Sequence, residues 1–188
     1  MVNQNKNTTN QILADSIKAL VLAKPVEKIT IKEITDKAGV IRPTFYNHFQ
    51  DKYELLEWII STEILEPAHP LIKNGLTNQA VLLIFTSLLR EKDFYSRLSR
   101  MDGPVSFEDM VVRCIQNVLV EIFLEYPRQK NGKFPWMSVD MLAEHYARSM
   151  CYAVKVWIRQ GMTIPAQEMA DTYEYLMSHS MEQAIREF

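Results

Sequence analysis

The sequence predicts an all-α fold of about nine helices. Apolar residues recur three and four positions apart through most of the chain, which is the spacing that gives a helix one apolar face. The 188 residues include only five glycines, so the chain has little material for the tight turns of β-hairpins. A hydrophobic fraction of 47% is enough for a folded core.

The N-terminal third begins with a polar arm. We expect this arm, residues 1–9, to be mobile. Residues 10–23 form the first helix, which ends before Pro25. Thr30, followed three positions later by Glu33, predicts a capping box that starts the second helix.

A glycine turn follows the second helix. Gly39 comes after its last apolar position and supplies the left-handed conformation that a tight turn needs. Residues 41–49 then form a third helix, in which Phe45 and Phe49 face inward and polar side chains face outward. Two short amphipathic helices joined by such a turn are typical of a helix-turn-helix DNA-binding unit.

Two prolines mark a change of organisation after a fourth helix, residues 51–65. Because Pro67 and Pro70 interrupt the helical pattern, we expect one domain over residues 1–66 and a second over residues 67–188. In the second domain the apolar spacing predicts five helices, over about 77–90, 93–101, 106–126, 138–161 and 165–185.

Composition and motif spacing exclude several classes of function. A net charge of −2 argues against binding nucleic acid by bulk charge, so any DNA contact must be local. Cys114 and Cys151 lie far apart without a CxxC partner, which indicates neither a disulfide framework nor a zinc site. The four histidines share no metal spacing, and the chain has no glycine-rich phosphate loop or nucleophile motif. We therefore expect no enzyme activity, no cofactor, no metal and no membrane span, and a location in the cytoplasm.

The outer face of residues 41–49 carries side chains that suit DNA recognition. Arg42 can pair with guanine, Thr44 can contact a base or a thymine methyl group, and Asn47 can reach adenine or a phosphate. The alternative is a three-helix packing unit with an ordinary polar surface. Phosphate donors are expected at Tyr46, His48 and Lys52, and at the N-terminus of the second helix beside Thr30 and Lys32.

Residues 30–52 resemble the DNA-binding domain of the TetR/AcrR family of transcriptional regulators. The resemblance covers about residues 11–65 and is most specific in a run of Phe, Tyr, any residue, His and Phe that is followed by lysine. The matching residues are Ile34, Ala38, Gly39, Val40, Thr44, Phe45, Tyr46, His48, Phe49, Lys52 and Leu55.

This resemblance implies a ligand-responsive homodimer, a repressor or an activator, that binds a palindromic double-stranded operator with one helix in each major groove. It also implies that residues 67–188 bind the effector and dimerise, with the dimer contact made by the last two long helices. Tyr46 and Lys52 match positions that grip the DNA backbone. The positions that lie nearest the bases are Arg42, Pro43 and Thr44.

Two residues depart from the family pattern. Ile41 stands where a serine is frequent and cannot cap a helix, and Pro43 stands where a small residue is common. Pro43 biases Arg42 away from helical geometry, so the helix can start one residue late and Arg42 can point elsewhere. These departures and the weak net charge leave a second hypothesis open, a protein-interaction adaptor that keeps the helix-turn-helix shape but has lost DNA binding.

The C-terminal part carries a second similarity. The spacing of Trp157, Gly161 and Pro165 resembles a subgroup that includes regulators of dihydroxyacetone kinase operons. A small apolar or amphipathic effector is expected among methionine, cysteine and aromatic side chains, each of which can equally be an ordinary core residue. The candidate lining residues are Phe85, Met101, Phe107, Met110, Cys114, Tyr146 and Met150.

Overall fold

The protein is built from helices joined by short turns and loops in the residues that the computed structural model describes, which are 2–125 and 134–187. The N-terminal elements are α1 (Val2–Val21), the short 3-10 helix η1 (Val26–Lys28), α2 (Ile31–Ala38), α3 (Arg42–Tyr46), α4 (Lys52–Ile59) and the π-helix η2 (Ile60–Leu65). The C-terminal elements are α5 (His69–Lys73), α6 (Thr77–Arg90), α7 (Lys92–Leu98), α8 (Phe107–Glu125), α9 (Val139–Arg159), α10 (Ala166–Ser178) and α11 (Met181–Glu187).

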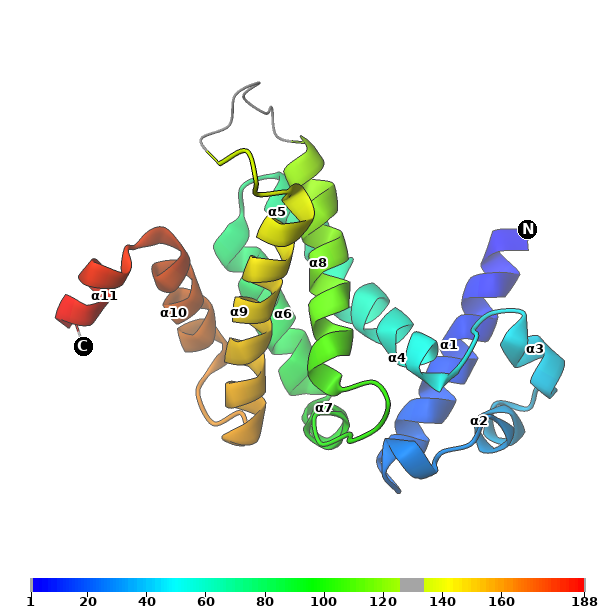
Figure 1. Cartoon of the computed structure of the whole chain (residues 1–188). Coiled ribbons are helices and arrows are strands. Elements are labelled where there is room, and N and C mark those ends of the chain that lie inside the picture. The colour runs from blue at the N-terminus through cyan, green and yellow to red at the C-terminus, as the bar shows by residue number, and fades with distance from the viewer. Residues whose placement is uncertain (1, 126–133, 188) are drawn as a thin grey trace.

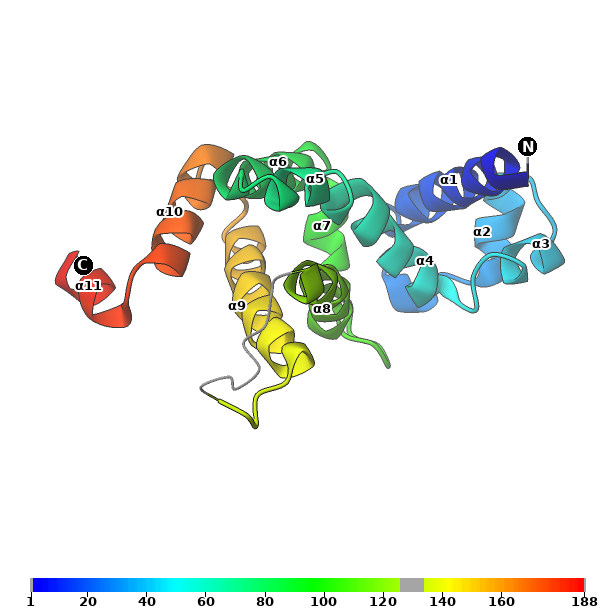
Figure 2. The same ribbon diagram turned by 90° about the horizontal axis from the view of Figure 1, so that it is seen from above.

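The arrangement is elongated, with α1 to α4 at one end and α10 and α11 at the other (Figure 1). The long helices α6, α8 and α9 lie between the two ends, and the chain termini are far apart (Figure 2). The all-α prediction is confirmed. The described residues form eleven α-helices rather than the expected nine, because the last expected helix is divided into two and α5 was not anticipated.

The N-terminal unit is built on α1. Leu13 and Ile17 of this helix are fully buried against Ile34, Phe45 and Leu55, which come from α2, α3 and α4. The expected start of the first helix at residue 10 is wrong, since α1 already begins at Val2 and includes the polar arm. No proline or glycine lies within residues 2–9, so the helix extends through these polar residues.

The joint between the two halves is a change of helix type. The predicted helix over residues 51–65 is α-helical only to Ile59 and continues as the π-helix η2. The Glu66 N–H donates to the Ser61 carbonyl five residues earlier, at 2.8 Å, which is the π-type bond. The same segment packs against α4, α6 and α8, so it lies where both halves of the molecule meet.

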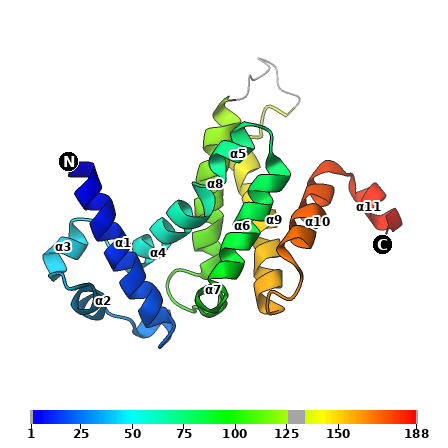
Figure 3. The same ribbon diagram turned by 180° about the vertical axis from the view of Figure 1, so that it is seen from behind.

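The C-terminal bundle is organised by two helix pairs. The helix α8 runs along α9 (Figure 1), and α10 lies against α6. Seen from behind, α6 lies in front of α9 (Figure 3). Trp157 of α9 is buried, packs edge to face on Phe85 with ring centroids 5.1 Å apart, and donates its indole N–H to the Ile164 carbonyl at 2.9 Å. These contacts fix the turn between α9 and α10, in which Gly161 has the left-handed φ of 78°.

The last expected helix, over residues 165–185, is divided. It stops at Ser178, and Ser180 begins α11 with its own cap, because the Ser180 hydroxyl accepts from the Gln183 N–H at 3.3 Å. The side chains of Met181 and Ile185 on α11 are 79% and 66% exposed. The final helix therefore presents apolar surface outside the bundle.

Candidate DNA-binding surface and effector cavity

The helix-turn-helix begins at the capping box that the sequence predicts. The Thr30 hydroxyl accepts from the Glu33 N–H at 3.3 Å, and the Glu33 carboxylate accepts from the Thr30 N–H at 2.9 Å. The Lys24 ammonium, together with the bonds from Thr30, lowers the pKa of Glu33 to about 2. The start of α2 is therefore fixed by a carboxylate that stays ionised at any physiological pH.

Gly39 and Pro43 set the path from α2 into α3. Gly39 is left-handed at φ 68°, and its N–H caps the end of α2 by donating to the Asp36 carbonyl. Ile41 precedes α3 in an extended conformation without a side-chain cap, and α3 starts at Arg42 with Pro43 in its first turn. The helix is shorter than the expected range 41–49, because turn-type bonds replace regular helix after Tyr46.

The outward face of α3 combines a cation, a phenol and an amide. Arg42, Pro43, Tyr46 and Asn47 are exposed, Thr44 is half-buried beside them, and Tyr46 keeps half of its surface accessible. The Arg42 guanidinium donates to the Tyr46 hydroxyl at 3.3 Å and lies over its ring. These five residues form one surface that can meet DNA.

His48 is turned toward α1. Its Nδ1 lies 2.6 Å from Oδ1 of the buried Asn10, and an amide oxygen only accepts, so Nδ1 carries the proton. One ring nitrogen of His48 therefore ties the end of α3 to α1.

Lys52 is turned toward η1. Its ammonium donates to the carbonyls of Val26, Glu27 and Ile29 at 2.7, 3.1 and 2.9 Å. Burial of this ammonium lowers the pKa of Lys52. Three backbone acceptors use the three donors of the side chain, so a phosphate contact by Lys52 requires the loss of at least one of these bonds.

Thr30 and Lys32 stand at the exposed start of α2. The Thr30 hydroxyl is used within the capping box, where it also donates to the Glu33 carboxylate at 2.8 Å. Lys32 pairs with Asp36 one turn later at 2.5 Å, and both side chains are mostly in solvent. An exposed pair of this kind is weak, so Lys32 can exchange its partner for a phosphate at little cost.

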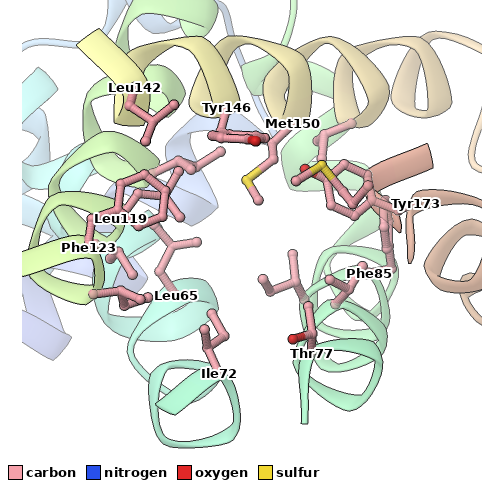
Figure 4. A pocket seen from close by; sticks show the side chains of 17 residues that line it. Leu65, Ile72, Thr77, Phe85, Leu119, Phe123, Leu142, Tyr146, Met150 and Tyr173 are labelled. Carbon is pink, nitrogen blue, oxygen red and sulfur yellow. The ribbon is translucent and has the colours of Figure 1, made fainter. Parts of the chain in front are cut away.

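The C-terminal bundle contains a cavity of about 520 Å³ that is partly open to solvent. Its walls come from η2, α5, α6, α8, α9 and α10, and the side chains labelled in Figure 4 surround an open centre. The lining residues are Leu65, Ile72, Thr77, Val81, Ile84, Phe85, Ile115, Val118, Leu119, Ile122, Phe123, Leu142, Tyr146, Met150, Val154, Tyr173 and Met177.

The cavity includes some of the expected lining residues and not others. Phe85, Tyr146 and Met150 belong to the wall. The other four candidates, Met101, Phe107, Met110 and Cys114, are buried core residues outside it. Met101 lies before α8, and the other three lie in the first half of α8, which packs on α4 and η2, where Cys114 approaches the Glu57 carbonyl at 3.7 Å. Only its second half faces the cavity.

Sequence reasoning missed most of the wall. The lining residues of α8, from Ile115 to Phe123, and Tyr173 and Met177 of α10 are not among the seven candidates that the sequence offers. A signal was present, because these residues repeat every three to four positions and so must share a face. Whether such a face meets another helix or a cavity is decided by packing and cannot be read from spacing.

Within residues 2–125 and 134–187, no helix has the length and apolar character needed to cross a membrane. Among the same residues, no three His, Cys, Asp or Glu side chains gather in a way that could hold a metal ion.

Comparison with known proteins follows the division seen in the geometry. Residues 14–59 match the family model described as bacterial regulatory proteins, tetR family. Residues 77–179 match a model described as the C-terminal region of a transcriptional regulator of the same group. The first match contains the capping box, the glycine turn and α3, and the second contains α6 to α10.

Similar proteins include regulators of known genes. The chain is 23% identical over 158 residues to the HTH-type dhaKLM operon transcriptional activator DhaS of Lactococcus lactis, covering 83% of this chain and 82% of the relative. It is 34% identical over 76 residues to the transposon Tn10 TetC protein of Escherichia coli, covering 40% of this chain and 39% of that protein.

Solved structures share the fold. The dihydroxyacetone kinase operon activator DhaS superposes with a TM-score of 0.60 at 21% identity, over 89% of this chain and 93% of the other. NalD, the secondary repressor of the MexAB-OprM multidrug efflux pump in Pseudomonas aeruginosa, gives 0.55 at 18% identity, over 88% and 92%. Because the C-terminal family model alone matches more than half of the chain, and the N-terminal model matches its helix-turn-helix, this chain belongs to the tetR family of bacterial DNA-binding transcriptional regulators.

Proposed function

We propose that this regulator acts as a homodimer that places α3 of each subunit in the major groove of a palindromic operator and responds to a small, mainly apolar effector. In this proposal residues 1–66 bind DNA, and residues 67–188 dimerise and bind the effector. The protein needs no cofactor, has no catalytic role, and works in the cytoplasm, where bacterial DNA is. The observation that carries the effector part is the apolar cavity of about 520 Å³, which is partly open to solvent and lies within the roughly 300 to 1,000 Å³ of small-molecule sites.

The exposed face of α3 supports the DNA contact. We assign base contacts to Arg42 and Thr44, with Pro43 packed beside them, and backbone contacts to Tyr46 and Asn47. His48 and Lys52 support the same surface from behind, because their bonds to α1 and η1 hold α3 and the start of α4 in place. The amides at the start of α2, beside Thr30 and Lys32, hold a further phosphate.

Exposed apolar side chains on the last helices support the dimer. Tyr152 on α9 and Leu176 on α10 are exposed, as are Met181 and Ile185 on α11. A second copy of the chain covers these side chains in the proposed dimer, which removes apolar surface from water. Two copies of α3 should then lie about 34 to 36 Å apart, one turn of DNA.

The relatives support regulation of either sign. DhaS is named as an activator and NalD as a repressor, and both share this fold. The same helix-turn-helix can serve activation and repression, since the two differ in where the operator lies.

DNA binding is tested by fluorescence anisotropy with the DNA upstream of the chain's own gene and with random DNA. Tyr46→Ala should weaken binding to both DNAs, because a backbone contact carries no sequence information. Thr44→Ala should mainly reduce the preference for the specific DNA. Arg159→Ala, at the exposed end of α9, is the control and should leave both affinities unchanged.

The same titration separates the regulator from an adaptor that has lost DNA binding. Lys52 and His48 favour the adaptor, because both side chains turn inward and bond to groups of the protein instead of presenting these donors to a phosphate. Absence of binding to any fragment at low salt would support it.

Sedimentation of Tyr152→Glu and Met181→Glu tests the dimer, since a charge on a buried interface should give monomers.

A further inference from the structure

The chemistry of the cavity wall limits what the cavity can hold. None of its lining residues is charged, and none carries an amide side chain. The polar side-chain atoms of the wall are the hydroxyls of Thr77, Tyr146 and Tyr173. A charged group in such a site loses its hydration without gaining an opposite charge, which costs far more than apolar contacts return.

One of these hydroxyls lacks a partner. The Tyr173 hydroxyl is buried and has no hydrogen-bond partner within the described chain, and its residue is only 7% exposed. Burial, and secondarily the nearby Tyr146, raises the pKa of Tyr173, so the phenol keeps its proton and remains a donor. An unpaired buried donor is costly, and a ligand acceptor that reaches the hydroxyl by displacing a neighbouring side chain recovers that cost.

The neighbouring side chains agree with a ligand that is held by a hydrogen bond from Tyr173, which we call the anchor, at the end of the cavity where Tyr173 lies. Tyr146 and Tyr173 lie on either side of Met150, and the remainder is lined mainly by aliphatic side chains, together with Phe85 and Phe123 (Figure 4). Met150 and Met177 are flexible and polarisable, so they can adjust to the shape of a bound molecule.

We propose that the effector is an uncharged, mainly apolar molecule with one hydrogen-bond acceptor, such as a ketone, ester or ether oxygen, that accepts a bond from Tyr173. This inference rests on the proposed function, because it takes the cavity as the effector site. Carboxylates, phosphates and amines are excluded by their charge. Small polyols are excluded because most of their hydroxyls would find no partner on this wall.

Three molecules of nearly equal shape test the proposal. Acetylnaphthalene carries a neutral acceptor, ethylnaphthalene carries none, and naphthoate is an anion. Each is titrated against the full-length protein loaded with the neutral fluorophore N-phenylnaphthylamine, and its displacement is measured. We expect acetylnaphthalene to bind about fivefold more tightly than ethylnaphthalene, and naphthoate at least about tenfold more weakly than either.

Two phenylalanine variants locate the anchor. Tyr173→Phe should bring acetylnaphthalene to the affinity of ethylnaphthalene, because only the hydroxyl is removed. Tyr95→Phe is the matched control, since the Tyr95 hydroxyl is also buried without a partner in the described residues but lies outside the cavity. It should leave the preference for acetylnaphthalene intact. The result is the ratio of the affinities for two ligands measured on the same variant. A general loss of stability would weaken the binding of both ligands and would not change this ratio.

The outcomes separate this inference from the function on which it rests. Naphthoate binding as tightly as acetylnaphthalene would overturn the neutral ligand class, and a ketone preference that survives in Tyr173→Phe would overturn the anchor. In both cases the cavity remains the effector site. Val118→Trp should fill the cavity and abolish fluorophore binding. Fluorophore binding that is absent in the wild type, or unchanged in Val118→Trp, would instead reject the cavity as the effector site.

Discussion

At the residue scale, two side chains of the helix-turn-helix act mainly on the backbone. Glu33 completes the capping box of α2, and the Lys52 ammonium donates to three backbone carbonyls of the segment between α1 and α2. Both hold the surface that carries Arg42 and Tyr46 without belonging to it. Their contributions can be measured apart from DNA binding.

The capping box should make stability depend on pH in acid. The folded-state pKa of Glu33 is lowered from 4.5 to about 2, so its stabilising effect is complete above pH 4.5 and is lost as the pH falls toward 2. Glu33→Gln has no carboxyl group to titrate at this position, so its free energy of unfolding should fall less as the pH is lowered toward 2. Urea unfolding from about pH 5 to pH 2 measures the difference between the two proteins. Glu121→Gln, an exposed change on α8, is the control, and an equal effect from it would contradict the assignment.

Lys52→Met distinguishes a structural from a DNA-gripping lysine. Loss of the ammonium should cost about 1 to 2 kcal/mol in the free energy of unfolding, because three carbonyls lose a charged donor. The salt dependence of binding to random DNA should stay the same. Unchanged stability with a salt slope reduced by about one unit would show instead that Lys52 binds a phosphate.

At the element scale, the turn between α2 and α3 depends on backbone freedom. A Cβ atom at Gly39 would meet no atom within 4 Å, so the cost of a side chain there is conformational and not steric. Gly39→Ala should lower stability by about 1 kcal/mol, because φ is 68° in the left-handed region. Thermal unfolding should shift by about 2 to 4 °C. Gly39→Asn should lose less, and an alanine variant as stable as the wild type would refute a left-handed turn.

At the scale of the whole molecule, η2 touches both the cavity and the N-terminal unit. Leu65 of this π-helix lines the cavity, and Glu63, two residues earlier, pairs with Lys18 of α1. Lys18 also pairs with Glu91 at 2.8 Å, just before α7. Although burial opposes the charge on Lys18, the two carboxylates raise its pKa, so both ion pairs persist well above neutral pH.

A second group of contacts joins the same halves. The Glu27 carboxylate accepts from the Asp102 N–H at 2.7 Å, and Arg113 of α8 pairs with Glu57 of α4. A ligand that displaces the cavity wall at Leu65 therefore acts on a segment that is bonded to the DNA-binding unit. This gives a physical route for coupling between the two sites.

Lys18→Met should weaken that coupling. Because the side chain touches neither the cavity wall nor α3, we expect effector binding and basal DNA affinity to change little. The factor by which the effector changes DNA affinity, typically about 5 to 150 for coupled sites, should fall several-fold. Anisotropy titrations with and without effector measure it. Lys155→Met, which breaks the pair with Glu108 inside the C-terminal bundle, is the control, and an equal loss of coupling in both variants would reject the route.

The sequence by itself determined the local features of this protein. The capping box of Thr30 and Glu33, the turn at Gly39 and the late start of α3 at Arg42 follow from backbone conformation and short-range hydrogen bonds, which depend on neighbouring residues. The fold class and the family rest on the same local patterns.

Tertiary structure alone decided which groups meet. Lys52 and His48 lie on the segment that the sequence assigned to DNA, yet their nitrogens find Val26 and Asn10, more than twenty residues away. Met110 and Cys114 carry the same apolar pattern as Leu119 on one helix, but only Leu119 reaches the cavity. Spacing along a helix fixes the face on which a residue lies, whereas the partner of that face depends on how distant helices pack.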